Sequence, residues 1–303
     1  MDFESVSLTE SELRLKRSLD ALTEAYGPAF IDSDPVSYLH RYEDPADIEI
    51  AGFIAASLAY GRVAIIKRSL EFVFDVMGET PKRFIEHFDP HLHGKPFDGF
   101  VHRFTRGKDM VSLFVLLGQM VRGWGSIEGF MCNGKNPTRD VGRLLSSFSS
   151  RALSMNVAGL YPGGVIPDDA GVRFFFPSPS NGSACKRLNL FLRWMVRGPD
   201  GVDLGIWRNL KPADLVVPMD VHIERISVFL GLVGGKGSSW RKAVEITNRL
   251  RRLDATDPTK YDYALTRLGI MGLCQGGRKK LNCIECPLSM HCIYGPDSGK
   301  EEV

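Results

Sequence analysis

Four cysteines lie within nineteen residues near the end of the chain, and this cluster limits what the C-terminal segment can fold into. Cys274, Cys283, Cys286 and Cys292 form the pattern C-x8-C-x2-C-x5-C in a mostly polar segment. Thiols this close in sequence serve as metal ligands or as disulfide partners. We expect metal ligands, because the rest of the chain is typical of a reducing compartment, where disulfides are rare.

The cysteine spacing favours an iron–sulfur cluster over zinc. Zinc sites commonly use two C-x2-C pairs separated by a dozen or more residues, and here only Cys283 and Cys286 form such a pair. Compact runs of four cysteines hold [4Fe–4S] clusters, although the bacterial ferredoxin spacing is tighter. We therefore expect a [4Fe–4S] cluster, with a zinc ion as the alternative.

The remaining composition is that of a globular protein, because 44% of its 303 residues are hydrophobic and 24% are charged. No apolar run approaches the roughly 18 residues that a membrane-spanning helix needs. The N-terminal segment is acidic and has no apolar stretch, so we expect no signal peptide. These features predict a cytoplasmic protein without a membrane partner.

Charge is distributed unevenly along the chain, although the formal net charge is only +2. Residues 1–50 carry 4 basic and 12 acidic side chains, a net charge of −8, whereas residues 183–292 carry 18 basic and 10 acidic side chains, a net charge of +8. A basic C-terminal part indicates a polyanionic partner, most simply nucleic acid. Two solvated faces of opposite sign are the alternative interpretation.

The spacing of apolar residues predicts an all-α protein. Residues 47–77 are too long an apolar stretch for strands and predict two helices broken near Gly61, while Thr9 and Glu12 form a capping box for an N-terminal helix. Turn-forming residues mark residues 89–108 and 156–184 as loops, and no β-ladder is expected. Further helices are expected at residues 110–122, 186–197, 219–230, 240–250 and 261–268.

Two polar residues open predicted helices at positions suited to catalysis. Lys186 begins a helix directly after the glycine-containing turn SPSNGSA, and Asp220 follows Pro218 at the start of another. Each has an ordinary structural explanation, because a first-turn lysine is usually solvated and an aspartate at this place is usually an N-cap. A catalytic role for Lys186 and Asp220 is indicated only when the two residues are considered together with the cysteine cluster.

In this order, the three features resemble the helix-hairpin-helix DNA glycosylases of the endonuclease III type. Lys186, Asn189 and Leu192 reproduce the family motif K-x-x-N-x-x-L, and PMDVHI at residues 218–223 reproduces its aspartate motif, with valine where threonine is usual. The four-cysteine loop follows with an x8 gap where the family has x6. The resemblance covers roughly residues 47–88 and 177–292. Within the superfamily, the chain resembles most a bacterial branch whose members are known only as glycosylase-like.

The resemblance implies a two-lobed helix-hairpin-helix fold that ends in a [4Fe–4S] loop held by all four cysteines. One helical domain would combine residues 1–46 with residues 177–303, and the other would comprise residues 47–176. A catalytic hairpin near residues 177–197 would lie at their interface. Residues 198–218 would be an insertion near the site.

The resemblance also implies catalytic roles for Lys186 and Asp220. Cleavage of an N-glycosidic bond develops positive charge at the sugar C1′, which a fixed carboxylate such as that of Asp220 stabilises. A neutral amine, here that of Lys186, can attack C1′ and form a Schiff base, after which β-elimination nicks the strand.

Further residues are expected to contact DNA or the extruded base. Backbone N–H groups of Gly182, Ser183 and Ala184 would bind phosphate, although Gly182 lies farther from the lysine than the family pattern places its last glycine. The basic run Arg278, Lys279 and Lys280 in the cluster loop would contact the DNA backbone.

Tyr60 and Arg62 would fill the gap in the duplex or contact the opposite strand, and Trp207 would stack on an extruded base. Alternatively, Tyr60 and Arg62 cap and pack the helix break, and Trp207 belongs to a small satellite core.

These inferences predict a DNA glycosylase of base excision repair, with AP lyase activity where Lys186 forms the Schiff base. Its partner would be damaged double-stranded DNA, bound by a monomer associated with the nucleoid. A non-catalytic protein that binds nucleic acid and senses lesions or redox state is the alternative function. A zinc-stabilised interaction domain is the third.

Overall fold

The computed structural model describes residues 7–133, 138–235, 237–274, 283 and 285–295. In these residues the protein is mostly helical, which confirms the all-α expectation at the level of fold class. One short antiparallel hairpin interrupts the helices and pairs Val101 with Arg106 and His102 with Thr105. The expectation that the chain contains no β-ladder is therefore wrong at this place. None of the described helices combines the length and the apolar character needed to cross a membrane.

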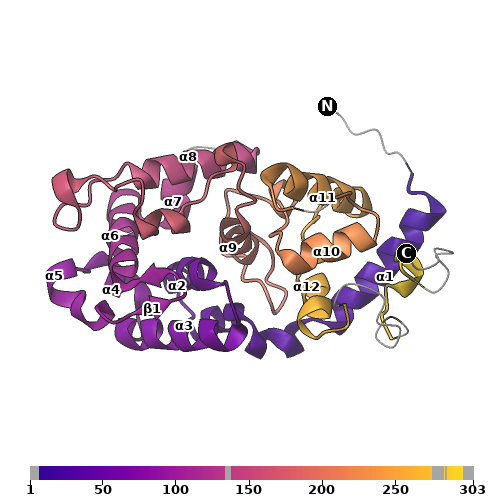
Figure 1. Ribbon diagram of the computed structural model, residues 1–303, viewed down its shortest axis with the longest axis horizontal. Coiled ribbons are helices and arrows are strands. Elements are labelled where there is room, and N and C mark those ends of the chain that lie inside the picture. Colours follow the sequence, from indigo (N-terminus) through magenta and orange to yellow (C-terminus); the bar gives the residue numbers. More distant parts are fainter. Residues whose placement is uncertain (1–6, 134–137, 236, 275–282, 284, 296–303) are drawn as a thin grey trace.

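The elements follow one another along the chain as Figure 1 shows. The α-helices are α1 (Glu10–Ala25), α2 (Pro45–Leu58), α3 (Val63–Met77), α4 (Pro81–Glu86), α5 (Pro90–His93), α6 (Gly107–Trp124), α7 (Ile127–Cys132), α8 (Val141–Leu153), α9 (Lys186–Val196), α10 (Val221–Phe229), α11 (Trp240–Leu253) and α12 (Asp262–Ile270). The strands are β1 (Val101–His102) and β2 (Thr105–Arg106). Short 3-10 helices lie at Pro28–Ser33, Pro35–Arg41, Lys95–Phe97, Pro162–Gly164, Gly171–Phe175, Pro179–Asn181, Pro212–Asp214 and Ser289–His291.

The first helix begins where the sequence predicts. The Thr9 side chain accepts a hydrogen bond from the Glu12 N–H, and the Glu12 carboxylate accepts one from the Thr9 N–H, so the capping box is formed. Although α1 lies at the start of the chain, it packs against α11 and α12 near the other end. Figure 1 shows α1 beside α12, far from the helices that follow it in sequence.

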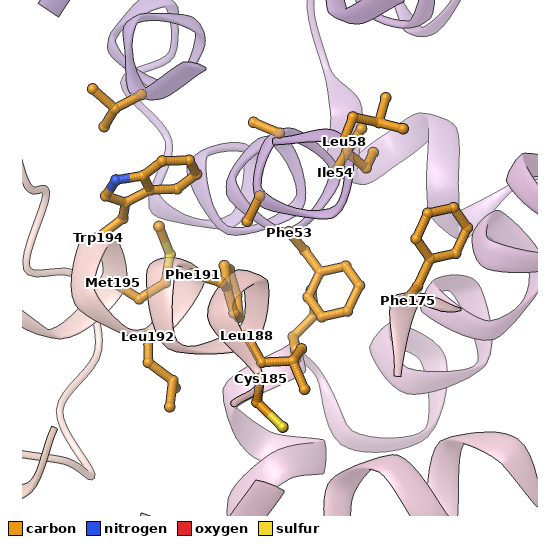
Figure 2. Close-up of a cluster of buried hydrophobic side chains, with 14 of the residues drawn as sticks. Phe53, Ile54, Leu58, Phe175, Cys185, Leu188, Phe191, Leu192, Trp194 and Met195 are labelled. Atoms are coloured by element: carbon orange, nitrogen blue, oxygen red, sulfur yellow. The ribbon is translucent and has the colours of Figure 1, made fainter. Parts of the chain in front are cut away.

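Helix α2 is the central element of the fold. Every residue from Asp47 to Leu58 is buried, so this helix is covered on all sides rather than along one stripe. Its principal neighbour is α9, and Figure 2 shows Phe53 of α2 directed at the side chains of α9. A Cβ on Gly52 would lie 2.8 Å from Met195 Cε, so glycine at this position allows the two helices to approach closely.

The break between α2 and α3 lies where the sequence predicts. Helix α2 ends at Leu58, α3 begins at Val63, and Gly61 between them has a φ of +100°, a value that favours glycine. The resulting turn, residues 59–62, faces the first turn of α9. This arrangement forms one wall of a cleft.

Candidate active site

One cleft of about 670 Å³ opens where the α2–α3 turn, α9, α10 and α12 meet. These elements lie far apart in sequence, so the cleft is a product of the tertiary fold. Its charged or titratable lining residues are Asp34, Tyr60, Arg62, Lys186, Arg193, Asp220, His222, Glu224, Asp262, Tyr263 and Arg267. Lys186 is the only lysine among the described residues of the lining. A cleft of this size with convergent polar groups is the place to look for chemistry.

The first turn of α9 directs Lys186 into the cleft. The residue before it, Cys185, adopts a left-handed conformation with a φ of +49°, and the Asn189 side chain donates a hydrogen bond to the Ala184 carbonyl at 3.0 Å. These features fix the entry into the helix. Lys186 Nζ donates to the Ala59 carbonyl oxygen at 3.2 Å, at the end of α2. Lys186, Leu190 and Arg193 share the cleft-facing side of α9, as a helical spacing of three and four residues requires.

Asp220 is the N-cap of α10, as its sequence position predicts. Its Oδ1 accepts hydrogen bonds from the N–H groups of His222 and Ile223, both at 2.9 Å. No described residue donates to Oδ2, and no ion pair joins Asp220 to Lys186 in the described part of the chain. The two side chains therefore line one cleft, although 34 positions separate them in sequence, and neither neutralises the other by direct contact.

A second carboxylate, that of Asp262, lies in the same cleft wall. Its Oδ2 accepts a hydrogen bond from Arg193, whereas its Oδ1 is buried without a partner in the described structure. Burial raises the pKa of Asp262 to about 6, with a smaller contribution from the charge of Asp220 and against the opposing effect of Arg193. The hydroxyl of the next residue, Tyr263, is also buried without a partner, and burial raises its pKa to about 12. This wall thus holds unsatisfied polar atoms.

His222 lines the same cleft as Lys186, Asp220 and Asp262. Burial lowers the pKa of this imidazole, Lys186 lowers it further, and Asp220 opposes the shift. A Cβ on Gly269 of α12 would lie 2.2 Å from His222 Nδ1, so α12 can pack this closely on α10 only with glycine there.

The buried carboxyl of Asp262 gives a stability that depends on pH. Because its folded pKa of about 6 lies above the ordinary value of 3.8, its contribution is fully present below pH 3.8 and is lost as the pH rises through about 6. We expect the free energy of unfolding of the wild type, minus that of Asp262→Asn, to fall by up to about 3 kcal/mol between about pH 4 and 7. Urea unfolding of both proteins at a series of pH values measures this difference. A difference that stays constant or grows with pH contradicts the assignment.

The predicted DNA-contacting residues occupy three different settings. Tyr60 and Arg62 lie in the α2–α3 turn and line the cleft. Gly182 is exposed and left-handed, with a φ of +77°, and its carbonyl accepts a hydrogen bond from the Trp240 N–H at 3.1 Å. Ser183 is half-buried and Ala184 is buried, and neither lines the cleft. Arg278, Lys279 and Lys280 lie outside the described residues.

Trp207 lies in the core rather than in the cleft. Its side chain is only 4% exposed, its ring packs edge-on against Phe191 at 5.2 Å, and its Nε1 donates to Glu49 Oε1 at 2.8 Å. Glu49 also accepts hydrogen bonds from the first two N–H groups of α7. The expected stacking of Trp207 on a substrate base is therefore corrected, because its ring and its N–H are both used to tie residues 198–218 to α2.

The four clustered cysteines form no disulfide. Burial raises the pKa of the Cys286 and Cys292 thiols, and the neighbouring cysteines add to both shifts, so the four groups lie within electrostatic reach of one another. Yet among the described residues no group of three or more His, Cys, Asp or Glu side chains is placed to hold a metal ion. Four thiols are suitable ligands for a thiophilic metal. In the structure, however, the described cysteine side chains are not arranged around one metal position.

Several cleft residues carry no signal in the sequence. Asp262, Tyr263 and Arg267 belong to α12, which the sequence predicts as a helix without any functional residue, and Arg193 looks like an ordinary helix residue. His222 lies two positions after Asp220 in the motif and could have been included on that ground. The others meet only in the tertiary structure, where Arg193 of α9 pairs with Asp262 of α12.

The comparisons with known proteins place the chain in a family. The model of the family described as "Protein of unknown function (DUF2400)" matches residues 34–271, which include Lys186, Asp220 and Asp262. No curated protein and no solved structure matches the chain. Because the matching family is not one of the helix-hairpin-helix glycosylases, the assignment to endonuclease III-type enzymes by resemblance is wrong. The chain belongs to the DUF2400 family of proteins of unknown function.

Proposed function

We propose that the cleft is the active site of an enzyme that cleaves the N-glycosidic bond of a damaged nucleotide in DNA. The observation that carries this proposal is that Lys186 and Asp220 line one cleft without neutralising each other. The proposal rests on this geometry and on the chemistry of the two groups, and not on membership of any glycosylase family.

The chemistry needs one amine and one carboxylate on the same sugar. As the bond from C1′ to the base breaks, the base leaves with the electron pair and takes up a proton, and the Asp220 carboxylate stabilises the positive charge that develops at C1′. Attack requires the unprotonated form of the Lys186 amine, which forms a bond to C1′. The nitrogen then passes a proton to the ring oxygen as the C1′–O4′ bond breaks, which gives a Schiff base. Loss of a proton from C2′ of this intermediate forms the C2′–C3′ double bond and expels the 3′-phosphate, which is the AP lyase activity.

Nucleic acid as the partner is supported by charge. The net charge of residues 183–292 is +8, and these residues supply Lys186, Arg193, Asp220 and Arg267 to the cleft. An excess of basic side chains favours binding of a phosphate backbone without reading of its sequence. Within the cleft this charge comes from Lys186, because Arg193 and Arg267 are buried and paired with Asp262 and Asp34.

The test is incubation of the protein with duplex oligonucleotides that each carry one damaged or missing base, with and without borohydride. We expect strand cleavage for at least one lesion, and a covalent protein–DNA adduct when borohydride reduces the Schiff base. Binding to lesions without cleavage or adduct would instead favour the non-catalytic, lesion-sensing function.

We also propose that the four-cysteine loop binds a [4Fe–4S] cluster, on the strength of four free thiols at C-x8-C-x2-C-x5-C spacing. The protein purified without oxygen is expected to be brown, with absorbance near about 400 nm and roughly four irons per chain. Cys286→Ser should lose this colour, and Cys132→Ser, a buried cysteine outside the loop, should keep it. A colourless protein with one zinc per chain would establish the alternative metal.

A further inference from the structure

A rim of arginine and aromatic side chains borders the cleft, and half of it carries no signal in the sequence. It consists of Tyr60 and Arg62 from the α2–α3 turn and of Arg103 and Phe104 from the tip of the β1–β2 hairpin. The two parts touch, because a Cβ on Gly61 would lie 2.9 Å from Arg103 Cδ. Tyr60 and Arg62 line the cleft, so the hairpin tip extends its wall outward.

The aromatic part of the rim is held in a fixed orientation. The Phe104 ring stacks on Tyr60 at 5.0 Å with an interplanar angle of 23°, and meets Phe174 edge-on at 4.4 Å. The Tyr60 hydroxyl donates to the His102 carbonyl at 2.9 Å and lies 2.6 Å from Thr105 Oγ1. Even so, Phe104 remains 53% exposed. Part of a large aromatic side chain is thus presented to solvent on a rigid support.

The charged part of the rim has no acidic counterpart. Arg62 and Arg103 are exposed, and neither makes an ion pair in the described part of the chain. Beneath them Arg187 is only 9% exposed, and its guanidinium donates to the carbonyls of Ser57 and Phe174 rather than to a carboxylate. Burial lowers the pKa of Arg187 to about 10. The Phe174 ring, whose centroid lies 3.5 Å from Arg187 Cζ, offsets part of the cost of burying this cation, so Arg187 adds positive charge beneath the rim without a carboxylate to neutralise it.

We propose that this rim binds unpaired nucleotides of a nucleic acid strand that passes over the cleft. A base stacks on the exposed part of Phe104, and Arg62 and Arg103 neutralise the neighbouring phosphates. Unpaired nucleotides fit better than an intact duplex, because the faces of paired bases are covered by their neighbours and cannot reach the ring. The proposal deepens the proposed function, on which it rests for the chemistry in the cleft, since it specifies the form of DNA that the site receives.

The test measures binding alone, by fluorescence anisotropy with a short oligothymidine, an undamaged duplex and heparin as probes. Phe104→Leu keeps an apolar side chain against Phe174 but removes the ring, and should weaken oligothymidine binding by roughly 5- to 100-fold, as expected for the loss of one base stack. Heparin binding should not change. Arg103→Gln should reduce the slope of log affinity against log salt for oligothymidine by about 0.7. Phe104→Trp should bind like the wild type, which also controls for folding.

Matched controls come from elsewhere on the surface. Phe72→Leu removes a partly exposed ring of α3, and Arg143→Gln removes an exposed arginine of α8. Both should bind oligothymidine like the wild type. The rim proposal is overturned if Phe104→Leu binds oligothymidine as the wild type does, or if it loses heparin and oligothymidine equally. If the wild type is trapped by borohydride on damaged DNA but does not bind oligothymidine, this proposal alone is overturned. If the wild type binds oligothymidine through the rim but is never trapped, the proposed chemistry alone is overturned.

Discussion

Replacing Lys186 by glutamine abolishes the covalent adduct that borohydride forms between the protein and damaged DNA. The amide of glutamine can still donate a hydrogen bond to the Ala59 carbonyl, which now receives one from Lys186 Nζ at 3.2 Å. What the variant loses is the primary amine, without which no Schiff base forms. We expect adduct formation to fall at least about a thousandfold, as removal of a nucleophile commonly does. Denaturing gels with a labelled oligonucleotide measure the adduct.

Two further variants separate the nucleophile from the charge. Lys186→Arg keeps a cation in the cleft but cannot form the adduct, so it should bind DNA like the wild type and still fail to be trapped. Lys211→Gln removes an exposed lysine outside the cleft lining and should leave the adduct unchanged. An adduct of undiminished yield with Lys186→Gln would mean that another amine is the nucleophile. The assignment of Lys186 would then be withdrawn.

The features that the sequence predicts well depend on neighbours along the chain. The capping box of Thr9 and Glu12 forms as expected, the apolar stretch 47–77 divides into two helices at Gly61, and Asp220 caps α10. Caps, breaks and helical periodicity involve residues at most a few positions apart, so a single sequence contains them. For the same reason the sequence alone places Lys186 and Asp220 where two helices begin.

The features that the sequence does not reveal are set by distant contacts. The pairing of Arg193 with Asp262 joins residues 69 positions apart, and nothing local marks either of them. The β1–β2 hairpin has strands of two residues each, too short for an alternating pattern to be visible. For Trp207 the sequence predicts a ligand contact that the structure does not show. An aromatic residue in a polar segment favours a role in ligand binding, but the Trp207 N–H donates a hydrogen bond to Glu49, 158 positions earlier in the chain.

Residues 198–218, which in sequence look like a loop added near the site, prove to be part of its support. Asp203 in this segment is completely buried and receives hydrogen bonds from both Arg193 and Arg197 of the α9 region. Arg193 in turn pairs with Asp262, and Arg197 pairs with Asp257 at 2.8 Å. This ion network joins α9, which carries Lys186, to α12, which carries the second carboxylate of the cleft. The position of the amine relative to the cleft wall therefore depends on Asp203.

Replacing Asp203 by asparagine is expected to destabilise the fold by about 3–5 kcal/mol, because it removes the one buried carboxylate that pairs with both Arg193 and Arg197. Asparagine has nearly the same volume, so the loss reports the missing charge rather than a cavity. Urea unfolding followed by circular dichroism measures the change, which should appear as a lower midpoint with an unchanged slope. At temperatures where the variant is folded, its cleft should also trap DNA less efficiently than the wild type.

The matched control for this charge is an ion pair on the surface. Arg41 and Glu71 lie 2.9 Å apart, with side chains 47% and 48% exposed, so water screens their attraction. Glu71→Gln should therefore change the free energy of unfolding by less than about 1 kcal/mol. A similarly small effect of Asp203→Asn would mean that water or a rearranged neighbour satisfies Arg193 and Arg197. The network would then not be what holds α9 against α12, and Lys186 would owe its place in the cleft to the apolar packing of α9 on α2 alone.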